Sequence, residues 1–290
     1  MKVLIIGATG MLGYSLFSNL SENNTLDVWG TVRNIDGKER YFRGREKKLI
    51  HGVDISNIEN LKAVINQLKP NFVLNCIGLI KQYKESKSPV AAISINSLFP
   101  HQLASMCDQA GSKLIHFSTD CVFSGNKGAY TEESTPDAKD VYGRSKLLGE
   151  VDYAPHLTLR TSIIGHELSS NVSLVDWFLT QSGKVKGFSK AIFSGLPTCY
   201  IAKILSESVF HLPELSGLYH LSVDPIDKYS LLQKVSDEYE KEIEIEESDE
   251  LVIDRSLSSK RFQDATGFKA PSWDHLLKEM HQDFLKYHKS

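Results

Sequence analysis

Short apolar runs alternate with amphipathic stretches through the first 165 residues of the chain. The runs are rich in Val, Ile and Leu, and the stretches between them repeat apolar residues with the period of a helix. This alternation is typical of βαβ units, so we expect a doubly wound α/β fold around a parallel sheet. The predicted strands are residues 2–7, 26–33, 47–55, 71–78, 112–120 and 157–165.

The amphipathic stretches between these strands are expected to be helices that cover the sheet. One of them, residues 89–111, contains Pro100, which cannot donate a backbone hydrogen bond and should kink or split the helix. The predicted helices are residues 11–23, 55–69, 89–111 and 140–151.

The pattern becomes less regular after residue 166. We expect residues 1–165 to form one domain, to which segments near 190–223 return, and residues 166–290 to form mainly a smaller, discontinuous lobe. In this part, helical patterns occupy 171–183, 199–212, 227–242 and 272–288, and extended patterns occupy 184–198 and 217–223.

Composition narrows the class of protein. With 41% apolar and 24% charged residues and a formal charge of −3, the chain resembles ordinary globular proteins. Basic and acidic residues are interspersed, apart from a mildly acidic segment at 242–250, which argues against nucleic acid as a partner. No apolar run approaches the roughly 18 to 20 residues of a membrane span, and no secretory signal precedes the first strand. We therefore expect a cytoplasmic protein without a membrane partner.

The cysteines and histidines form no metal-binding pattern. Cys76, Cys107, Cys121 and Cys199 are widely separated, which is typical of free thiols in a reducing cytosol. The ten histidines include no HExxH spacing. No metal site is expected.

Three glycines lie between the first strand and the first helix. Gly7, Gly10 and Gly13 form a G-x-x-G-x-x-G array. Glycines at such a turn let the backbone approach a pyrophosphate, which the N–H groups of the helix N-terminus then bind. The alternative is a tight strand-to-helix turn without a ligand. The glycine array lies directly after a buried strand, and this position favours a dinucleotide site.

The end of the second strand bears on the choice of cofactor. NAD sites usually place a carboxylate there, about 20 residues after the glycines, to accept from the ribose 2′-hydroxyl. Here Asp27 lies at the beginning of the strand, and its end carries Arg33. A guanidinium suits a 2′-phosphate, so we expect NADP(H) rather than NAD(H). The alternative is that Arg33 is only a solvated loop residue.

A candidate catalytic group follows the strand at 112–120. This strand ends in Ser118 and Thr119, at the carboxyl edge where open α/β sheets bind ligands. On the next predicted helix, Tyr142 and Lys146 are four residues apart and share one face. Such a pair is common on solvated helices, but it is far more specific after a hydroxyl-bearing strand end and an N-terminal glycine turn.

The order of GATGMLG, STDCVF and YGRSK resembles that of the extended short-chain dehydrogenase/reductases. Within them, STDCVFSGNKGAYTEESTPDAKDVYGRSKLLGE is similar to the dTDP-4-dehydrorhamnose reductase branch, and the similarity spans nearly the whole chain. The resemblance implies a Rossmann domain with a smaller C-terminal substrate-binding lobe. It also implies that Tyr142 donates a proton, that Lys146 is its electrostatic partner, and that Thr119 is the third catalytic residue. Asn96 would be a structural or proton-relay residue.

The resemblance also implies contacts with cofactor and substrate. Asp54, an adenine contact in this scheme, could instead cap a helix starting at Ser56. Lys184, Lys186 and Arg255 are candidates for diphosphate contacts by charge alone, with solvation as the alternative. The implied cofactor contacts are Gly7, Thr9, Gly10, Met11, Leu12, Gly13, Arg33, Asp54, Ile55, Cys76, Ile77, Gly78, Tyr142 and Lys146, and the implied substrate contacts are Asp120, Cys121, Val122, Phe123 and Arg255.

Two departures from the branch concern the sugar pocket. Cys121 stands where many members have a tyrosine, and the segment at 78–89 differs from the usual one. The reaction class is therefore better determined than the sugar.

The expected function is NADP-dependent reduction of the 4-keto group of a nucleotide-activated deoxysugar in polysaccharide biosynthesis, with dTDP-4-dehydrorhamnose converted to dTDP-rhamnose. One alternative is another nucleotide-sugar ketoreductase, epimerase or dehydratase of the superfamily. An alternative of a different class is a non-catalytic NADP-sensing protein. The partner is a nucleotide sugar, and a homodimer is the assembly considered.

Overall fold

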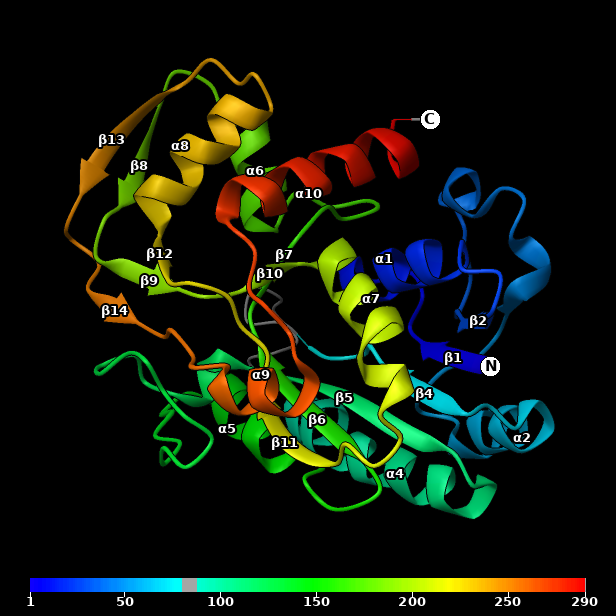
Figure 1. Cartoon of the computed structure of the whole chain (residues 1–290). Coiled ribbons are helices and arrows are strands. Elements are labelled where there is room, and N and C mark those ends of the chain that lie inside the picture. The colour runs from blue at the N-terminus through cyan, green and yellow to red at the C-terminus, as the bar shows by residue number, and fades with distance from the viewer. Residues whose placement is uncertain (80–87, 290) are drawn as a thin grey trace.

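A computed structural model of the chain describes residues 1–79 and 88–289. Its centre is a seven-stranded sheet in the order β11-β6-β5-β4-β1-β2-β3, with every neighbouring pair parallel. The doubly wound α/β fold predicted from the sequence is confirmed (Figure 1). The strands are β1 (Lys2–Ile6), β2 (Asp27–Thr31), β3 (Leu49–Ile50), β4 (Phe72–Asn75), β5 (Lys113–Thr119), β6 (Leu157–Thr161) and β11 (Gly217–His220).

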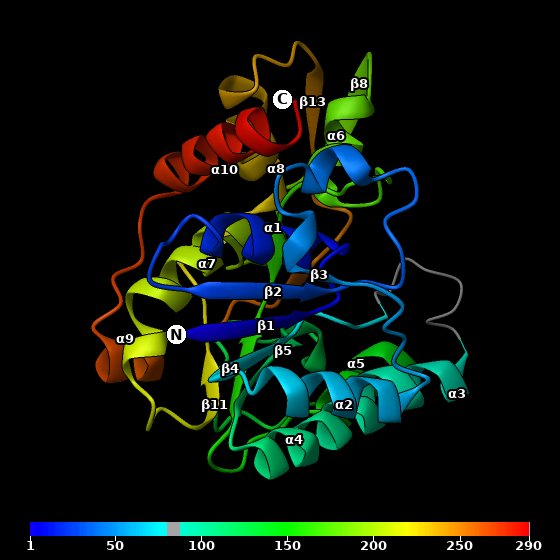
Figure 2. The same cartoon turned by 90° about the vertical axis from the view of Figure 1, so that its right-hand side faces the viewer.

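Helices cover both faces of this sheet (Figure 2). Alternate residues of β1 enter two different cores: Val3 and Ile5 join the larger cluster, whereas Leu4 and Ile6 join the smaller one. This two-sided burial explains the continuous apolar run of the first strand. One face carries α1 (Met11–Leu20) and α7 (Thr198–Glu207), and the other carries α2 (Ile58–Leu68), α4 (Phe99–Ala110) and α5 (Val141–Leu148).

The helical stretch around Pro100 is interrupted as predicted, but just before the proline. It consists of α3 (Pro89–Ala92), a π-helical segment η4 (Ile93–Leu98) and α4. Pro100 lies in the first turn of α4, where a missing N–H is tolerated. The irregular segment contains Asn96.

The observed strands are shorter than the predicted ones, and the third and the sixth show why. The third was predicted over 47–55 but β3 spans only Leu49–Ile50, because 3₁₀ turns precede it and Gly52 has a φ of +71°. The sixth ends at Thr161, after which the chain turns away and a short β7 pairs with β10. The elements involved are η1 (Glu39–Phe42), η2 (Glu46–Lys48), β7 (Ile163–Ile164) and β10 (Leu196–Pro197).

The rest of the chain forms a lobe above the carboxyl ends of the sheet (Figure 1). It contains a three-stranded sheet, β12-β9-β14, and a two-stranded parallel sheet, β13-β8. Its elements are α6 (Leu174–Thr180), β8 (Lys184–Phe188), β9 (Ala191–Phe193), β12 (Ile226–Asp227), α8 (Lys228–Glu238), β13 (Glu244–Ser248), β14 (Ile253–Asp254) and α10 (Trp273–Tyr287). Two 3₁₀ turns, η5 (Asp120–Val122) and η6 (Val209–His211), and α9 (Lys260–Thr266) complete the described elements.

The acidic segment at 242–250 contains a strand that the sequence analysis did not predict. Ile243 and Ile245 pack against the larger core, and the glutamates between and after them point to solvent or to lysines of β8.

Of the segments near 190–223 that were expected to return to the N-terminal domain, Gly217–His220 joins the main sheet. The division into domains remains a prediction. None of the helices in the described ranges is long and apolar enough to cross a membrane.

Candidate active site

The carboxyl ends of β4, β5 and β6 and the N-terminus of α1 face a cavity of about 540 Å³ below the lobe. Residues of β9, β14 and the start of α8 close it from the other side. The cavity therefore brings together segments that are far apart in the sequence. The predicted site residues that line it are Gly10, Met11, Leu12, Cys76, Ile77, Gly78, Thr119, Asp120, Cys121, Tyr142, Lys146 and Arg255.

Val122 and Phe123, predicted as substrate contacts, do not line the cavity. Both are fully buried in a separate cluster with Tyr130 and Leu257, and the Phe123 ring stacks on Tyr130 at 4.1 Å between centroids. The 3₁₀ turn η5 after Thr119 directs the chain inward at this point. Of the four predicted substrate contacts in this segment, only Asp120 and Cys121 therefore line the cavity.

The glycine turn has the close approaches that a dinucleotide site requires. Gly7 has a φ of +88°, and a Cβ there would lie 2.6 Å from Ile77 Cγ1. A Cβ on Gly13 would lie 2.1 Å from the Gly7 carbonyl oxygen, so only glycine lets α1 begin so near β1. Gly10 caps the helix without a side chain, and Thr9 is half-buried in the same turn. The free N–H groups of the first helical turn suit a pyrophosphate.

Arg33 and Asp54 lie together, and neither lines the cavity that holds Tyr142 and Lys146. The Arg33 side chain is 80% exposed, and its Nη1 lies 4.0 Å from Asp54 Oδ2. Asp54 accepts hydrogen bonds from the Ser56 N–H and hydroxyl, which hold the pKa of its carboxyl below the usual value. Helix α2 begins later, at Ile58, and its cap is Asn57. Asp54 therefore stabilises the preceding turn, and Ile55 beside it packs on the smaller core.

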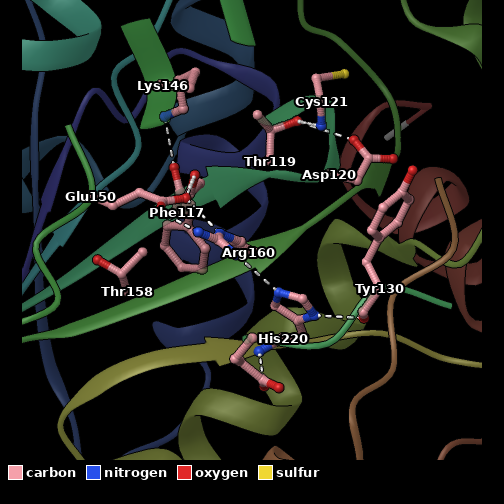
Figure 3. Close-up of polar contacts among 12 residues, drawn as sticks. Phe117, Thr119, Asp120, Cys121, Tyr130, Lys146, Glu150, Thr158, Arg160 and His220 are labelled. Carbon is pink, nitrogen blue, oxygen red and sulfur yellow. Dashed lines mark hydrogen bonds and ion pairs between the residues drawn. The ribbon is translucent and has the colours of Figure 1, made fainter. Parts of the chain in front are cut away.

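Lys146 is held in place by the strand beneath it. Asp140 caps α5, and Gly143 lets the helix approach η5, the turn that follows β5, since a Cβ there would lie 2.3 Å from the Cys121 carbonyl oxygen. The buried Lys146 Nζ donates to the Phe117 carbonyl at 2.8 Å (Figure 3). Burial lowers the pKa of this ammonium to about 8, and the charge of Glu150 opposes that shift.

Tyr142 and Thr119 face the same cavity. Burial raises the pKa of the Tyr142 phenol above 10, the nearby Cys121 adds to the shift, and hydrogen bonding with Thr119 opposes it. The ammonium of Lys146, its expected electrostatic partner, would by itself lower this pKa. In the structure the removal of the phenol from water outweighs any such effect.

Asn96 joins three parts of the site. Its Oδ1 accepts from the Leu79 N–H at 2.9 Å, and its Nδ2 donates to Ser145 Oγ at 3.1 Å. Gly149 permits the contact of α5 with η4, since a Cβ there would lie 1.8 Å from the Asn96 carbonyl oxygen. These contacts fit the structural role considered for Asn96, and residues 80–87 of the unusual segment lie outside the described residues.

Next to α5 lies a buried ion pair that the sequence analysis missed. Arg160 donates from Nε and Nη2 to the two carboxylate oxygens of Glu150, both at 2.7 Å (Figure 3). The side chains are 3% and 6% exposed, and Ser118 also donates to Glu150 at 2.6 Å. Arg160 Nη1 lies 3.3 Å from His220 Nε2, and burial together with this cation lowers the pKa of His220 to about 4. The available signal was a charged residue within the apolar strand LTLRT.

The lysines proposed for diphosphate contacts are placed differently from Arg255. Lys184 pairs with Glu244 and Glu246, and Lys186 pairs with Glu250, on the exposed β8-β13 sheet. Neither lysine lines the main cavity. Arg255 does, and its Nε donates to the Phe123 carbonyl at 2.9 Å.

Comparison with protein families agrees with this geometry. The sequence profile of the family described as "RmlD substrate binding domain" matches residues 1–286. The chain belongs to this family. As a member it is an NAD(P)-dependent oxidoreductase of the extended short-chain dehydrogenase/reductase type, as its motifs predicted.

Known relatives of this family member differ in their activities. The chain is 26% identical over 233 residues to dTDP-4-dehydrorhamnose reductase of Salmonella typhimurium, covering 76% of this chain and 72% of that protein. It is 31% identical over 149 residues to methionine adenosyltransferase 2 subunit beta of Mus musculus, covering 51% and 41%. The crystal structure of dTDP-4-dehydrorhamnose reductase from Bacillus anthracis in complex with NADP shares the fold, with a TM-score of 0.78, 20% identity, and 97% and 99% of the two chains covered.

Proposed function

We propose that this protein uses NADPH to reduce the 4-keto group of a nucleotide-activated deoxysugar, and that the sugar nucleotide is dTDP-4-dehydrorhamnose, which becomes dTDP-rhamnose. One observation carries the proposal: a single cavity holds the N-terminus of α1 together with Thr119, Tyr142 and Lys146. The similarity to the Salmonella reductase over most of the chain supports the choice of substrate.

The residues present suit proton donation to a keto oxygen. A bound nicotinamide would supply the hydride. Because burial raises the Tyr142 pKa, the phenol holds its proton at neutral pH and is ready to act as the acid. As the carbonyl is reduced its oxygen becomes negatively charged and takes that proton, and Lys146 then stabilises the phenolate that remains. With a pKa of about 8, Lys146 is largely protonated at pH 7.

The preference for NADP rests on the end of the second strand. Arg33 is free to turn toward a 2′-phosphate because its side chain is mostly exposed, and no carboxylate occupies the end of β2. The NADP complex of the Bacillus anthracis relative agrees with this preference.

A second candidate follows from the likeness to methionine adenosyltransferase 2 subunit beta. In that case the chain would bind NADP as a subunit without turning over a sugar nucleotide. Epimerases and dehydratases of the superfamily are the remaining rivals, and they return the hydride to the sugar. Net consumption of NADPH separates the reductase from all of them.

The test is NADPH oxidation, followed at 340 nm, with a panel of dTDP- and UDP-linked 4-keto sugars. We expect turnover with dTDP-4-dehydrorhamnose, and a fall in kcat of about 10²- to 10⁴-fold in Tyr142→Phe, because the proton donor is lost. Tyr153→Phe is the control, since Tyr153 is outside the cavity and bonds to His101. If the wild type oxidises no NADPH with any sugar of the panel, the proposed function is wrong. The cytoplasmic location and the homodimer remain predictions.

A further inference from the structure

The Thr119 hydroxyl makes hydrogen bonds with both residues that follow it in the chain. Its oxygen accepts from the Cys121 N–H at 3.1 Å, and it donates to Asp120 Oδ1, also at 3.1 Å (Figure 3). A hydroxyl has only one proton to donate. While Asp120 accepts that proton, Thr119 cannot donate it to a substrate oxygen or to the Tyr142 phenolate.

Asp120 is well placed to compete for this proton. Its side chain lines the same cavity, and the residue is only 6% exposed. Burial raises the pKa of this carboxyl, and the cations Arg255 and Lys228 oppose the shift. Within the described part of the chain these cations act at a distance, because neither forms an ion pair with Asp120. Thr119, by donating to the carboxylate, also favours its ionised form.

The groups that face Asp120 come from separate parts of the chain. Thr119 and Cys121 flank it in the chain, Tyr142 approaches from α5, and Lys228 and Arg255 come from the lobe. The negative charge of Asp120 in turn raises the pKa of the Tyr142 phenol. A change of charge on Asp120 therefore affects both Thr119 and Tyr142, the two groups proposed to act on the substrate oxygen.

We propose that Asp120 is a positioning residue that directs the Thr119 proton, an inference that deepens the proposed reductase function. In the neutral form its carboxyl O–H donates to Thr119 Oγ1, and the Thr119 proton turns toward the reacting oxygen. In the ionised form the carboxylate again accepts a hydrogen bond from Thr119, so the Thr119 proton no longer points toward the reacting oxygen. The neutral form of Asp120 is thus the active one, and kcat falls as the pH rises through its pKa.

The first test is the pH dependence of kcat with NADPH and the 4-keto sugar nucleotide. We expect Asp120→Asn to lose the fall in kcat that is assigned to Asp120, because an amide has no proton to release in this pH range. Thr119→Val should also lack this fall, with a kcat about 10²-fold below the wild-type low-pH plateau, because a donor to the developing charge is gone. Thr119→Ser should restore both the kcat and its fall with rising pH. Lys228→Met should move the fall to higher pH, since it removes a cation that favours the ionised carboxyl.

Two results of this test would overturn the proposal. One is an Asp120→Asn enzyme with an unchanged pH profile, which would show that Asp120 does not control the rate. The other is a large loss of kcat in Asp120→Asn at all pH values, which would show that the ionised carboxylate is needed.

A second measurement needs no turnover. The Asp120 carboxyl carbon can be titrated by ¹³C NMR in protein labelled with [γ-¹³C]aspartate, with Asp120→Asn identifying the signal. Thr119→Val should raise the midpoint, because the ionised form loses a hydrogen-bond donor, and Thr119→Ser should not. An unchanged midpoint in Thr119→Val would contradict the proposed donation. If the midpoint shifts but the wild type oxidises no NADPH, the proposed function fails while the coupling of Thr119 to Asp120 stands.

Discussion

The two ends of the predicted dinucleotide site, at Lys146 and at Arg33, differ in how their cations are held. Lys146 is buried, its Nζ donates to the Phe117 carbonyl, and the helix that carries it is fixed by close contacts at two glycines. Arg33 is 80% exposed, and its one ion-pair partner in the described chain, Asp54, is 4.0 Å away. The catalytic end is therefore arranged by the fold, whereas the Arg33 end is free to be ordered by a ligand.

This difference has an energetic counterpart. Removing one partner of a buried pair leaves a charge without compensation, whereas a solvated cation loses little when its neighbour is removed. Substitutions behind the catalytic end should therefore act mainly on folding, and substitutions at the Arg33 end should act mainly on binding.

The largest effect is expected for Arg160→Ala. This change leaves the buried Glu150 carboxylate without its bidentate partner and should lower the free energy of unfolding by about 3–5 kcal/mol. Urea unfolding followed by circular dichroism measures the loss. The matched control is Lys260→Ala, which breaks an exposed pair with Asp264 (78% and 64% exposed) and should cost under about 0.5 kcal/mol. Equal, small losses of stability in both variants would show that the buried pair does not stabilise the fold more than the exposed pair.

The next effect is a pH dependence of stability that arises at His220, beside the buried Arg160. His220 is fully buried, with a pKa of about 4 instead of 6.5, so the unfolded chain binds more protons than the folded one between these values. Stability should fall as the pH drops from 6.5 to about 4, and His220 should contribute up to roughly 3 kcal/mol of the fall. Urea midpoints across this range should be less pH-dependent in His220→Gln than in the wild type. Parallel curves for the two proteins would contradict the assignment.

A smaller effect is expected in the glycine turn between the two ends. Gly13→Ala places a Cβ 2.1 Å from the Gly7 carbonyl oxygen and should lower the free energy of unfolding by about 1–3 kcal/mol. Gly10→Ala is the control, because its Cβ would meet Gly7 O at an ordinary 3.6 Å. We expect Gly10→Ala to keep wild-type stability but to bind NADPH more weakly in fluorescence titrations. Equal stability losses would mean that the turn is not limited by this contact.

The smallest effect on folding is expected for Arg33→Ala. The free energy of unfolding should change by less than about 0.5 kcal/mol, since the side chain is mostly solvated. The KM for NADPH should nevertheless rise by about tenfold through the loss of a charge-assisted contact with the 2′-phosphate. The KM for NADH should stay unchanged. A similar rise for both cofactors would show that Arg33 does not read the 2′-phosphate.

Local patterns in the sequence were sufficient for the order of the main strands and helices in the first 165 residues. Burial on both faces produces apolar runs such as β1, and amphipathic helices repeat their apolar residues every turn. The acidic strand β13 was missed because its glutamates pair with lysines of β8, and those partners are about 60 residues away in the chain. The third strand was predicted too long because the positive φ of Gly52 is a property of the folded turn.

By itself, the sequence determined the α/β alternation, the glycine turn, and the spacing of Tyr142 and Lys146, because each depends on residues close together in the chain. Only the tertiary structure decided which predicted residues share a cavity: it brought Arg255 to Asp120 and turned Phe123 into the core. It also decided the protonation of the site. The pKa shifts of Tyr142, Lys146 and Asp120 are caused mainly by removal from water, and that burial exists only after distant segments have packed together.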